Sequence, residues 1–321
     1  MREPLKKVPL LPGTLKNLFF PPEKGEYTYF ARAKEQPFVG GDFVTKGAWA
    51  ADASMLAYGR YGTAEMPISD FQAHLDRGGL RCLNLIGADW RGQGTQGYFA
   101  ANDQFAILAF RGTEPGDPVD AVYDGDILPV PELEYRSNRR ADRFGQVAFV
   151  HHGFQLALTP HWLHIAKCVA EYRREHPKAE ICFTGHSLGG ALAILASSRL
   201  EDGNISVYTF GGPRVGDAGF SRRLLAAPAK TIVRFVNFND SVAYVPTTGL
   251  YESAPRICHR FDEQGRLSEF QGSFLGDVAA LATVFSRFTV RLTDELAKLP
   301  AAPGLVDHSA ARYCIRLWNC L

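Results

Sequence analysis

The chain lacks an excess of charge of either sign. Its 321 residues include 35 Lys and Arg against 34 Asp and Glu, which gives a formal net charge of +1 at pH 7. A balance this close to neutral offers no electrostatic footprint for nucleic acid, so we expect no nucleic-acid partner. Hydrophobic residues make up 46% of the chain, which is typical of a folded globular protein and not of a disordered one.

Long hydrophobic runs are also missing. No stretch approaches the roughly 18 apolar residues that predict a membrane-spanning helix. The apolar stretch near the N-terminus is cut by Pro9, Pro12 and Lys16, so it does not have the core of a signal peptide. These absences predict a chain without a transmembrane segment. They favour a cytoplasmic location, with secretion without a recognisable signal peptide as the alternative.

Cysteine is present but follows no motif. The six cysteines form no CxxC pair and have no metal-like spacing from histidine, so we expect no zinc and no other metal or cofactor. Cys168 and Cys182 fall on apolar faces, which is typical of small core residues. A disulfide between Cys314 and Cys320 stays open.

The organisation of the chain favours one domain. Residues 1–40 are rich in Pro, Lys and aromatic residues without clear periodicity, and we expect an irregular extension packed on the domain. No Pro-, Gly- or Ser-rich linker divides the rest of the chain. Residues 41–321 are therefore predicted to form a single domain.

Hydrophobic periodicity predicts several helices. Apolar residues share one helical face over 43–58, 69–77 and 278–299. A further helix is expected to begin with Thr159 as its N-cap and Pro160 at its first position. Its predicted buried face holds Trp162, Ile165, Val169 and Tyr172.

Strand patterns alternate with helices in the second half of the chain. The runs 95–101 and 104–111, separated by Asn102-Asp103, predict a hairpin. Further on, the predicted elements are strands at 181–184, 205–210 and 231–238, helices at 188–200 and 217–226, and a hairpin of 257–261 with 267–270. This alternation predicts an α/β fold with a mostly parallel central sheet flanked by helices.

The strongest chemical signal is the segment Gly185-His186-Ser187-Leu188-Gly189, which lies between a predicted strand and a predicted helix. Small flanking residues allow the chain to turn sharply and leave the hydroxyl of Ser187 exposed, as in the nucleophile elbow of hydrolases. The amide of Leu188 then points at the substrate carbonyl from a helix N-terminus. The alternative interpretation is a plain tight turn.

A serine nucleophile needs a histidine base and an acid that orients it. In the chain order of α/β-hydrolases both partners follow the serine. Asp240 comes directly after the strand at 231–238, at the same sheet edge as Ser187. Of the two later histidines, His259 lies in a strand-like run and His308 in a loop, so we assign His308 as the base.

Six blocks in this order resemble the class 3 lipases, the family of fungal triacylglycerol lipases and their bacterial and plant relatives. The blocks are FRGT at 110–113, VHHGF at 150–154, TGHSLGGALA at 184–193, FGGPRVG at 210–216, NFNDSV at 237–242 and DH at 307–308. The resemblance implies an α/β-hydrolase fold and a Ser187, Asp240 and His308 triad. It also implies an oxyanion hole formed by Thr113 together with the amide of Leu188.

The same resemblance implies supporting roles for other conspicuous residues. His151 and His152 match a structural joint before a helix and not a metal site. Arg111 and Arg214 match anchors of loops near the site. Residues 114–145 depart from the family pattern, because they carry mixed charges with apolar residues between them where many members have a short lid containing Trp. A hinged cover and a plain solvated loop both stay open.

The expected function is a serine hydrolase that cleaves carboxylic esters of lipids, as a triacylglycerol lipase or carboxylesterase does. Its partner is a lipid or other ester substrate, with transient contact at a lipid–water interface. A phospholipase A1 or a feruloyl-type esterase would use the same triad, since acyl-group choice depends on pocket walls. A non-catalytic binding or signalling protein on the same fold is the third hypothesis.

Overall fold

A computed structural model describes residues 7–14, 17, 22, 26–61, 66–87, 95–112, 128–132, 147–201, 204–226, 230–246, 249–255, 257–271 and 306–321. Within these residues the centre of the molecule is an eight-stranded sheet in the order β1-β2-β3-β6-β7-β8-β9-β10. The strands are Arg81–Ile86 (β1), Gly97–Ala101 (β2), Phe105–Phe110 (β3), Glu180–His186 (β6), Ile205–Phe210 (β7), Lys230–Asn237 (β8), Ile257–Phe261 (β9) and Leu267–Gln271 (β10).

The sheet is mostly parallel, as the alternation of elements predicts. Strands β3, β6, β7, β8 and β9 pair in parallel, whereas β1, β2 and β10 join antiparallel at the two edges. Every residue of β3 and β7 is buried, and this explains the nearly continuous apolar run of β3. The two predicted hairpins are confirmed as β2–β3 and β9–β10. No sequence pattern predicts β1, an edge strand whose residues are mostly part-exposed.

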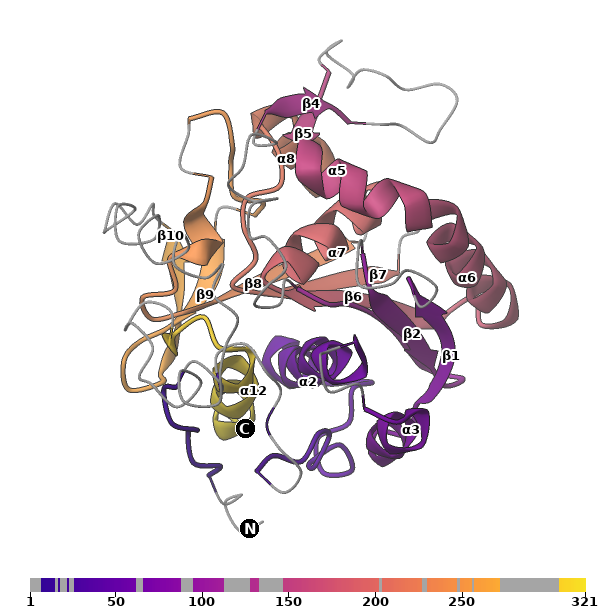
Figure 1. Ribbon diagram of the computed structural model, residues 1–321, viewed down its shortest axis with the longest axis vertical. Coiled ribbons are helices and arrows are strands. Elements are labelled where there is room, and N and C mark those ends of the chain that lie inside the picture. Colours follow the sequence, from indigo (N-terminus) through magenta and orange to yellow (C-terminus); the bar gives the residue numbers. More distant parts are fainter. Residues whose placement is uncertain are drawn as a thin grey trace.

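Helices cover both faces of the sheet (Figure 1). One face carries α5 (His152–Leu158), α6 (Trp162–Glu175), α7 (Leu188–Ser198) and α8 (Ala218–Ala226), and the other carries α2 (Phe43–Tyr61), α3 (Ile68–Arg77) and α12 (Ala310–Asn319). Successive side chains of β3 point to opposite faces, so Leu108 joins the core beneath α5 to α7 while Ile107 joins the core against α2 and α12. The predicted α/β architecture is confirmed.

The prediction that Thr159 caps a helix is wrong. The chain is already helical before it, and Thr159 begins a short 3-10 turn (η1, Thr159–His161) that follows α5. Its hydroxyl donates to the carbonyl of Gln155, 2.6 Å away, instead of capping the next helix. Helix α6 then starts at Trp162, and its predicted apolar face is buried as expected.

The structure also tests the expectations for the cysteines and for two segments of the chain. Cys168 and Cys182 are buried core residues. Cys314 and Cys320 are both free, so the disulfide left open from the sequence does not form: Cys314 is buried and Cys320 is exposed. The predicted helix over 278–299 lies outside the described residues. Of residues 114–145 only 128–132 are described, and part of them forms β4 (Pro129–Pro131), which pairs with β5 (Phe149–His151).

Aromatic residues from the N-terminal forty contribute to the core. Tyr29, Phe30 and Phe38 are each at most 3% exposed. The ring of Phe30 lies 5.3 Å from that of Trp49, and the ring of Phe38 stacks 4.3 Å from that of Phe105. Phe30 and Phe38 thus pack on α2 and β3. The division into an extension of residues 1–40 and a domain of residues 41–321 stays a prediction.

Asp52 on α2 is the anchor for this packing. Its carboxylate is fully buried and accepts hydrogen bonds from the Tyr27 hydroxyl at 2.5 Å and the Phe30 amide at 2.6 Å. Burial raises the pKa of Asp52 to about 7, although these donors favour the charged form. The N-terminal stretch is therefore fastened to α2 through a carboxylate that titrates near neutral pH.

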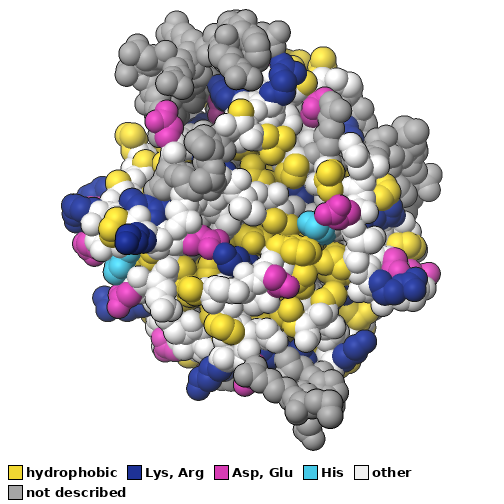
Figure 2. Space-filling view, turned by 180° about the vertical axis from the view of Figure 1, so that it is seen from behind, with side chains coloured by type: hydrophobic (Ala, Val, Ile, Leu, Met, Phe, Trp, Pro, Cys, Tyr) yellow, Lys and Arg dark blue, Asp and Glu magenta, His cyan; other side chains and the backbone are white. Residues whose placement is uncertain are grey.

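The surface shown in Figure 2 is mixed in character. Hydrophobic side chains gather across the middle of this face, while Lys, Arg, Asp and Glu lie mostly toward its rim and intermingle there. This distribution agrees with the formal net charge of +1. Among the described residues, no helix combines the length and the hydropathy needed to span a bilayer.

We expect the Asp52→Asn substitution to change how stability depends on pH. Between the ordinary Asp pKa of 3.8 and its folded value of about 7, the folded chain holds a proton that the unfolded chain releases. Stability from this group therefore falls as pH rises through that window, by about 1.4 kcal/mol per pH unit. The side-chain amide of the variant cannot titrate. The free energy of unfolding of wild type should therefore fall relative to that of the variant by about 2–3 kcal/mol from about pH 5 to about pH 7.

Urea unfolding at several pH values measures this difference. The exposed carboxylate Asp70 on α3 provides the matched control, since Asp70→Asn removes one negative charge without touching the Asp52 cluster. Parallel pH profiles for wild type and Asp52→Asn would contradict the expectation.

Candidate active site

The turn between β6 and α7 is strained at a single residue. Ser187 has φ 57° and ψ −130°, a conformation that costs energy for any residue with a side chain. A Cβ added to Gly185 would lie 2.1 Å from the carbonyl carbon of Gly189, and one added to Gly189 would lie 2.3 Å from the oxygen of Phe110. Both glycines are therefore required for the turn, and it forms as the sequence predicts.

The turn presents Ser187 at the surface of an otherwise buried segment. Ser187 and Leu188 are part-exposed, whereas the residues on either side of them are buried. The Ser187 amide donates to the carbonyl of Phe210 at 3.0 Å, which ties the turn to the end of β7. Leu188 is the first residue of α7, so its amide belongs to the donor-rich N-terminus of that helix.

The second predicted oxyanion residue, Thr113, lies outside the described residues. The chain just before it is described. Strand β3 ends at Phe110, which is paired with Gly185 at the end of β6. A Cβ on Gly112 would lie 2.6 Å from the carbonyl oxygen of His186, so the chain passes directly beside the turn immediately before Thr113.

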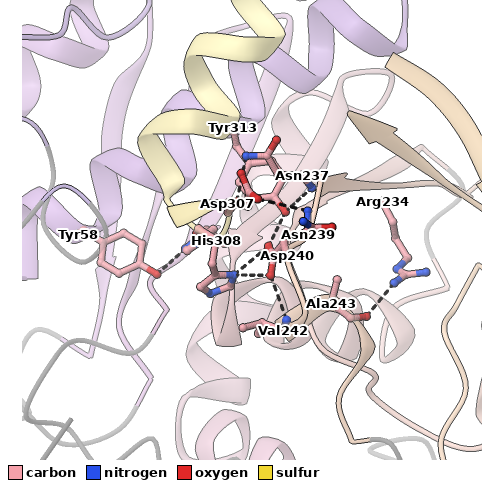
Figure 3. Close-up of polar contacts among 11 residues, drawn as sticks. Tyr58, Arg234, Asn237, Asn239, Asp240, Val242, Ala243, Asp307, His308 and Tyr313 are labelled. Atoms are coloured by element: carbon pink, nitrogen blue, oxygen red, sulfur yellow. Dashed lines mark hydrogen bonds and ion pairs between the residues drawn. The ribbon is translucent and has the colours of Figure 1, made fainter. Parts of the chain in front are cut away.

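Asp240 and His308 meet at the same sheet edge (Figure 3). The His308 Nδ1 atom lies 2.9 Å from Oδ2 and 3.0 Å from Oδ1 of Asp240. Asp240 follows the end of β8 and is 0% exposed, and His308 is 6% exposed. The structure thus brings together two residues that are 68 positions apart in the sequence.

Two further donors complete the surroundings of Asp240. The amide of Val242 donates to Oδ1 at 3.0 Å, and the hydroxyl of Tyr313 donates to Oδ2 at 2.6 Å. Tyr313 also accepts a hydrogen bond from the amide of Asn237 at 2.9 Å. The buried carboxylate is therefore compensated by hydrogen bonds from the loop after β8 and from α12.

Gly211, at the end of β7, makes room for this pair. It has φ +59°, and a Cβ placed on it would lie 2.3 Å from Oδ2 of Asp240 and 2.9 Å from Nδ1 of His308. Both the backbone conformation and the available space therefore require glycine. The next residue, Gly212, differs in this respect, because its nearest neighbour would be 3.4 Å away.

His186 bridges α2 to the loop that carries His308. Its Nε2 atom lies 2.5 Å from the carbonyl oxygen of His308, and its Nδ1 atom lies 2.9 Å from the hydroxyl of Tyr58. Burial, with a smaller effect from the neighbouring His308, holds the pKa of His186 well below its ordinary value, so the ring is neutral. Because a carbonyl can only accept, Nε2 carries the proton and Nδ1 accepts from Tyr58.

Asp307 fixes the same loop from the other side. Its carbonyl accepts a hydrogen bond from the side-chain amide of Asn237 at 2.9 Å, and its Oδ2 accepts from the amide of Asn239 at 3.3 Å. Arg312 lies 3.6 Å from Oδ1. Burial raises the pKa of Asp307. The loop is thus held at its backbone as well as at its side chains.

His259, the other histidine after Ser187, and two acidic residues that follow Ser187 are engaged elsewhere. His259 lies on β9 and stacks on Phe43, with ring centroids 4.4 Å apart. Asp217 accepts a hydrogen bond from the amide of Phe220 at 2.7 Å, at the start of α8. Asp262 pairs with Arg266 in the turn between β9 and β10. Each of these three side chains is therefore committed to packing or to a turn away from the Asp240–His308 pair.

His151 and Arg214 make contacts that fit the structural roles expected of them. His151 is fully buried at the start of α5, where its ring stacks 4.0 Å from that of Phe154. Arg214 donates from its guanidinium to the carbonyl of Pro246 at 3.1 Å and thereby anchors the loop after Asp240. Arg111 is 7% exposed. Within the described residues, no group of three or more His, Cys, Asp or Glu side chains is arranged to hold a metal ion.

The sequence did not reveal Tyr58, Gly211 or Tyr313 as parts of the site. Gly211 stands in a block that supports the family resemblance, and the pair of adjacent glycines in that block could have drawn attention to it. Tyr58 and Tyr313 have no local signal, because each reaches the site from a helix distant in sequence.

Comparisons with known proteins match the central part of the chain to one family. Residues 107–250 match the family described as lipase (class 3). A secreted mono- and diacylglycerol lipase of Malassezia globosa is 30% identical over 145 residues, which is 44% of this chain and 46% of that protein. A chloroplastic phospholipase A1 of Arabidopsis thaliana is 39% identical over 93 residues, which is 26% of this chain and 18% of that protein. The chain thus spans less than half the length of these relatives.

Solved structures of lipases share the fold. A Rhizomucor miehei lipase propeptide complex has a TM-score of 0.56 at 19% identity, covering 81% of this chain and 88% of that one. A triacylglycerol lipase with a serine-protease triad as its catalytic centre has a TM-score of 0.54 at 21% identity, covering 79% and 94%. The α/β-hydrolase fold is confirmed.

The names of these relatives can be compared with the expected cellular location of the protein. The Malassezia lipases are named as secreted proteins and the Arabidopsis phospholipase as chloroplastic, so the expectation of a cytoplasmic location finds no support among them. Residues 107–250, less than half of the chain, match the class 3 lipases, and the described residues share the fold of solved lipases.

Proposed function

We propose that this protein is a serine hydrolase that cleaves carboxylic esters of lipids, with Ser187 as nucleophile, His308 as base and Asp240 as the acid that orients it. The observation that carries the proposal is the buried Asp240–His308 pair at the sheet edge where Ser187 occupies a strained turn. A binding protein on the same fold has no need for that combination, which argues against the non-catalytic hypothesis.

The hydrogen bonds of Asp240 support the assignment of the base. Its carboxylate is ringed by donors, so it accepts the Nδ1 proton of His308 and holds the ring in one tautomer. The Nε2 atom then has a free lone pair. In the proposed reaction it takes the Ser187 proton as the hydroxyl attacks the ester carbonyl, and it returns that proton to the leaving alcohol.

The oxyanion of the tetrahedral intermediate needs donors that are already in place. We assign the amide of Leu188, at the N-terminus of α7, and the amide and hydroxyl of Thr113. Support for Thr113 comes from the described chain before it, which passes beside the carbonyl of His186 at Gly112. Water then hydrolyses the acyl-enzyme by the same base, and no metal or other cofactor enters the reaction.

The substrate class follows from the relatives and not from the triad. Their names include a mono- and diacylglycerol lipase, a triacylglycerol lipase and phospholipases A1. We therefore propose acylglycerols as substrates, met in transient contact at a lipid–water interface. Phospholipid acyl chains are the second candidate, and feruloyl-type esters the third. Secretion is the proposed location, by analogy with the Malassezia lipases.

Replacing Ser187 by Ala should abolish turnover. We expect kcat to fall by at least about 10³-fold on p-nitrophenyl esters, triolein and phosphatidylcholine alike, because the nucleophile is lost. A fluorophosphonate probe should label wild type and not the variant. Thermal unfolding serves as the control, since Ala tolerates the turn no worse than Ser. Unchanged turnover with no adduct on Ser187 in folded wild type would refute the proposal.

The two later histidines should respond differently to the same substitution. His308→Ala is expected to lower kcat by at least about 10³-fold, because no other base is hydrogen-bonded to Asp240 among the described residues. His259→Ala should leave kcat/KM within about twofold, since His259 lies on β9 and packs on Phe43 of α2. Steady-state kinetics of both variants decides between them, and a large loss in His259→Ala alone would reverse the assignment.

Two adjacent glycines give a matched test of whether the space beside Asp240 and His308 is needed for activity. Gly211→Ala should lower kcat by about 10²-fold or more, because the new methyl group displaces Asp240 and His308. Gly212→Ala makes the same chemical change where the space is sufficient and should retain activity within a few-fold. In an Asp240→Ala background, Gly211→Ala should add little further loss. An equal further loss there would mean that the glycine acts through the fold and not through the pair.

A further inference from the structure

The loop that carries His308 is touched by a segment from the far end of the chain. The described residues 8–14 and 17 form what we term the N-terminal strap. The hydroxyl of Ser309 donates to the carbonyl of Asn17 at 2.7 Å. The strap also packs on Val306, whose Cγ1 lies only 2.9 Å from where a Cβ on Gly13 would be. The strap therefore touches the residues on both sides of the Asp307-His308 pair.

The bond from Ser309 replaces the one expected at its position. Ser309 is the N-cap residue of α12, where a serine oxygen ordinarily accepts a hydrogen bond from the first helical turn. No side-chain capping bond forms at this helix. Ser309 is 4% exposed, and its hydroxyl is directed instead to the strap, 292 residues away in the sequence. A capping position is thus used to hold a distant segment.

The strap also holds the opposite end of α12. The amide of Val8 donates to Oδ1 of Asn319, and Nδ2 of Asn319 donates to the carbonyl of Val8, both at 2.8 Å. The side-chain amide of Asn319 is thereby paired with both backbone polar groups of one strap residue. Figure 1 shows the indigo N-terminal segment beside the yellow α12. The strap spans the helix from its N-cap to its last residue.

Helix α12 is the support on which the proposed base depends. His308 immediately precedes the N-cap residue of the helix, and Tyr313 of the helix donates to Asp240. A shift of α12 would therefore move His308 and Tyr313 together relative to Asp240. Displacements of about 1 Å at a reacting group cost on the order of 10²-fold in rate. Contacts that fix α12 are contacts that fix the catalytic geometry.

We propose that the N-terminal strap is a positioning element for the base: its contacts with Ser309, Val306 and Asn319 hold α12 and its preceding loop where His308 meets Asp240. This role rests on the proposed function of His308. It also gives residues 8–14 and 17 a part in positioning the base, although none of their hydrogen bonds reaches the triad.

The test removes the strap contacts one at a time in the full-length chain. Asn319→Ala deletes both bonds to Val8, and Ser309→Ala deletes the bond to Asn17. Each should lower kcat by about fivefold and the double variant by about 20-fold or more, with KM within about twofold. Hydrogen–deuterium exchange should rise by at least about fivefold in the amides of 306–313, while that of β6 and β7 stays unchanged.

Asn204→Ala is the matched control. The side-chain amide of Asn204 donates to the carbonyl of Lys178 at 2.8 Å, the same kind of bond as at Asn319. It lies just before β7, at the amino edge of the parallel sheet, whereas His308 lies at the carboxyl edge. The control should leave kcat and the exchange of 306–313 at wild-type values, and a loss equal to that of Asn319→Ala would overturn the strap's role.

A His308→Ala background separates positioning from a general effect on folding. If the strap acts through His308, Asn319→Ala should not lower the residual rate of His308→Ala any further. A further fivefold loss in that background, or unchanged kcat and exchange in the double variant, would overturn the inference. Failure of the proposed function is distinguishable, because it would leave turnover intact in Ser187→Ala while the exchange result still reports on the strap.

Discussion

The arrangement depends on one carboxylate that is removed from water. Asp240 is 0% exposed, and a buried carboxylate is tolerated only when hydrogen-bond donors surround it. The donors come from three places: the loop after β8, the loop before α12 and α12 itself, through Val242, His308 and Tyr313. Satisfying Asp240 therefore assembles the site, since each donor draws its own segment to the carboxyl edge of the sheet.

The two halves of the proposed triad are held by different physics. Ser187 is placed by local covalent geometry: a single residue with positive φ between β6 and α7, flanked by glycines that permit no side chain. His308 is placed by tertiary contacts, since its backbone carbonyl meets His186 and its ring meets Asp240. The position of Ser187 therefore depends little on the rest of the fold. The position of His308 depends on how α12 packs.

This difference explains what could be predicted from the sequence. Strand β3 is buried on both faces, so its apolar run was recognisable, and the elbow around Ser187 has a short local motif. Asp240 could be placed because it follows a strand whose direction the alternation of elements predicts. Thr159 misled because helix signals assume that the preceding residues are not helical, whereas α5 runs directly into it.

The residues that sequence reasoning missed are those whose role exists only after folding. Tyr313 donates to a carboxylate 73 positions earlier, and no spacing rule connects the two. The requirement for Gly211 arises from its positive φ and from the volume of Asp240 and His308, and its neighbours in the sequence reveal neither. The proposed nucleophile thus has a five-residue motif, whereas the position of the proposed base depends on contacts from both ends of the chain. The N-terminal strap fits the same pattern. Because α12 positions both Tyr313 and His308, contacts along its whole length help to hold these two residues in place.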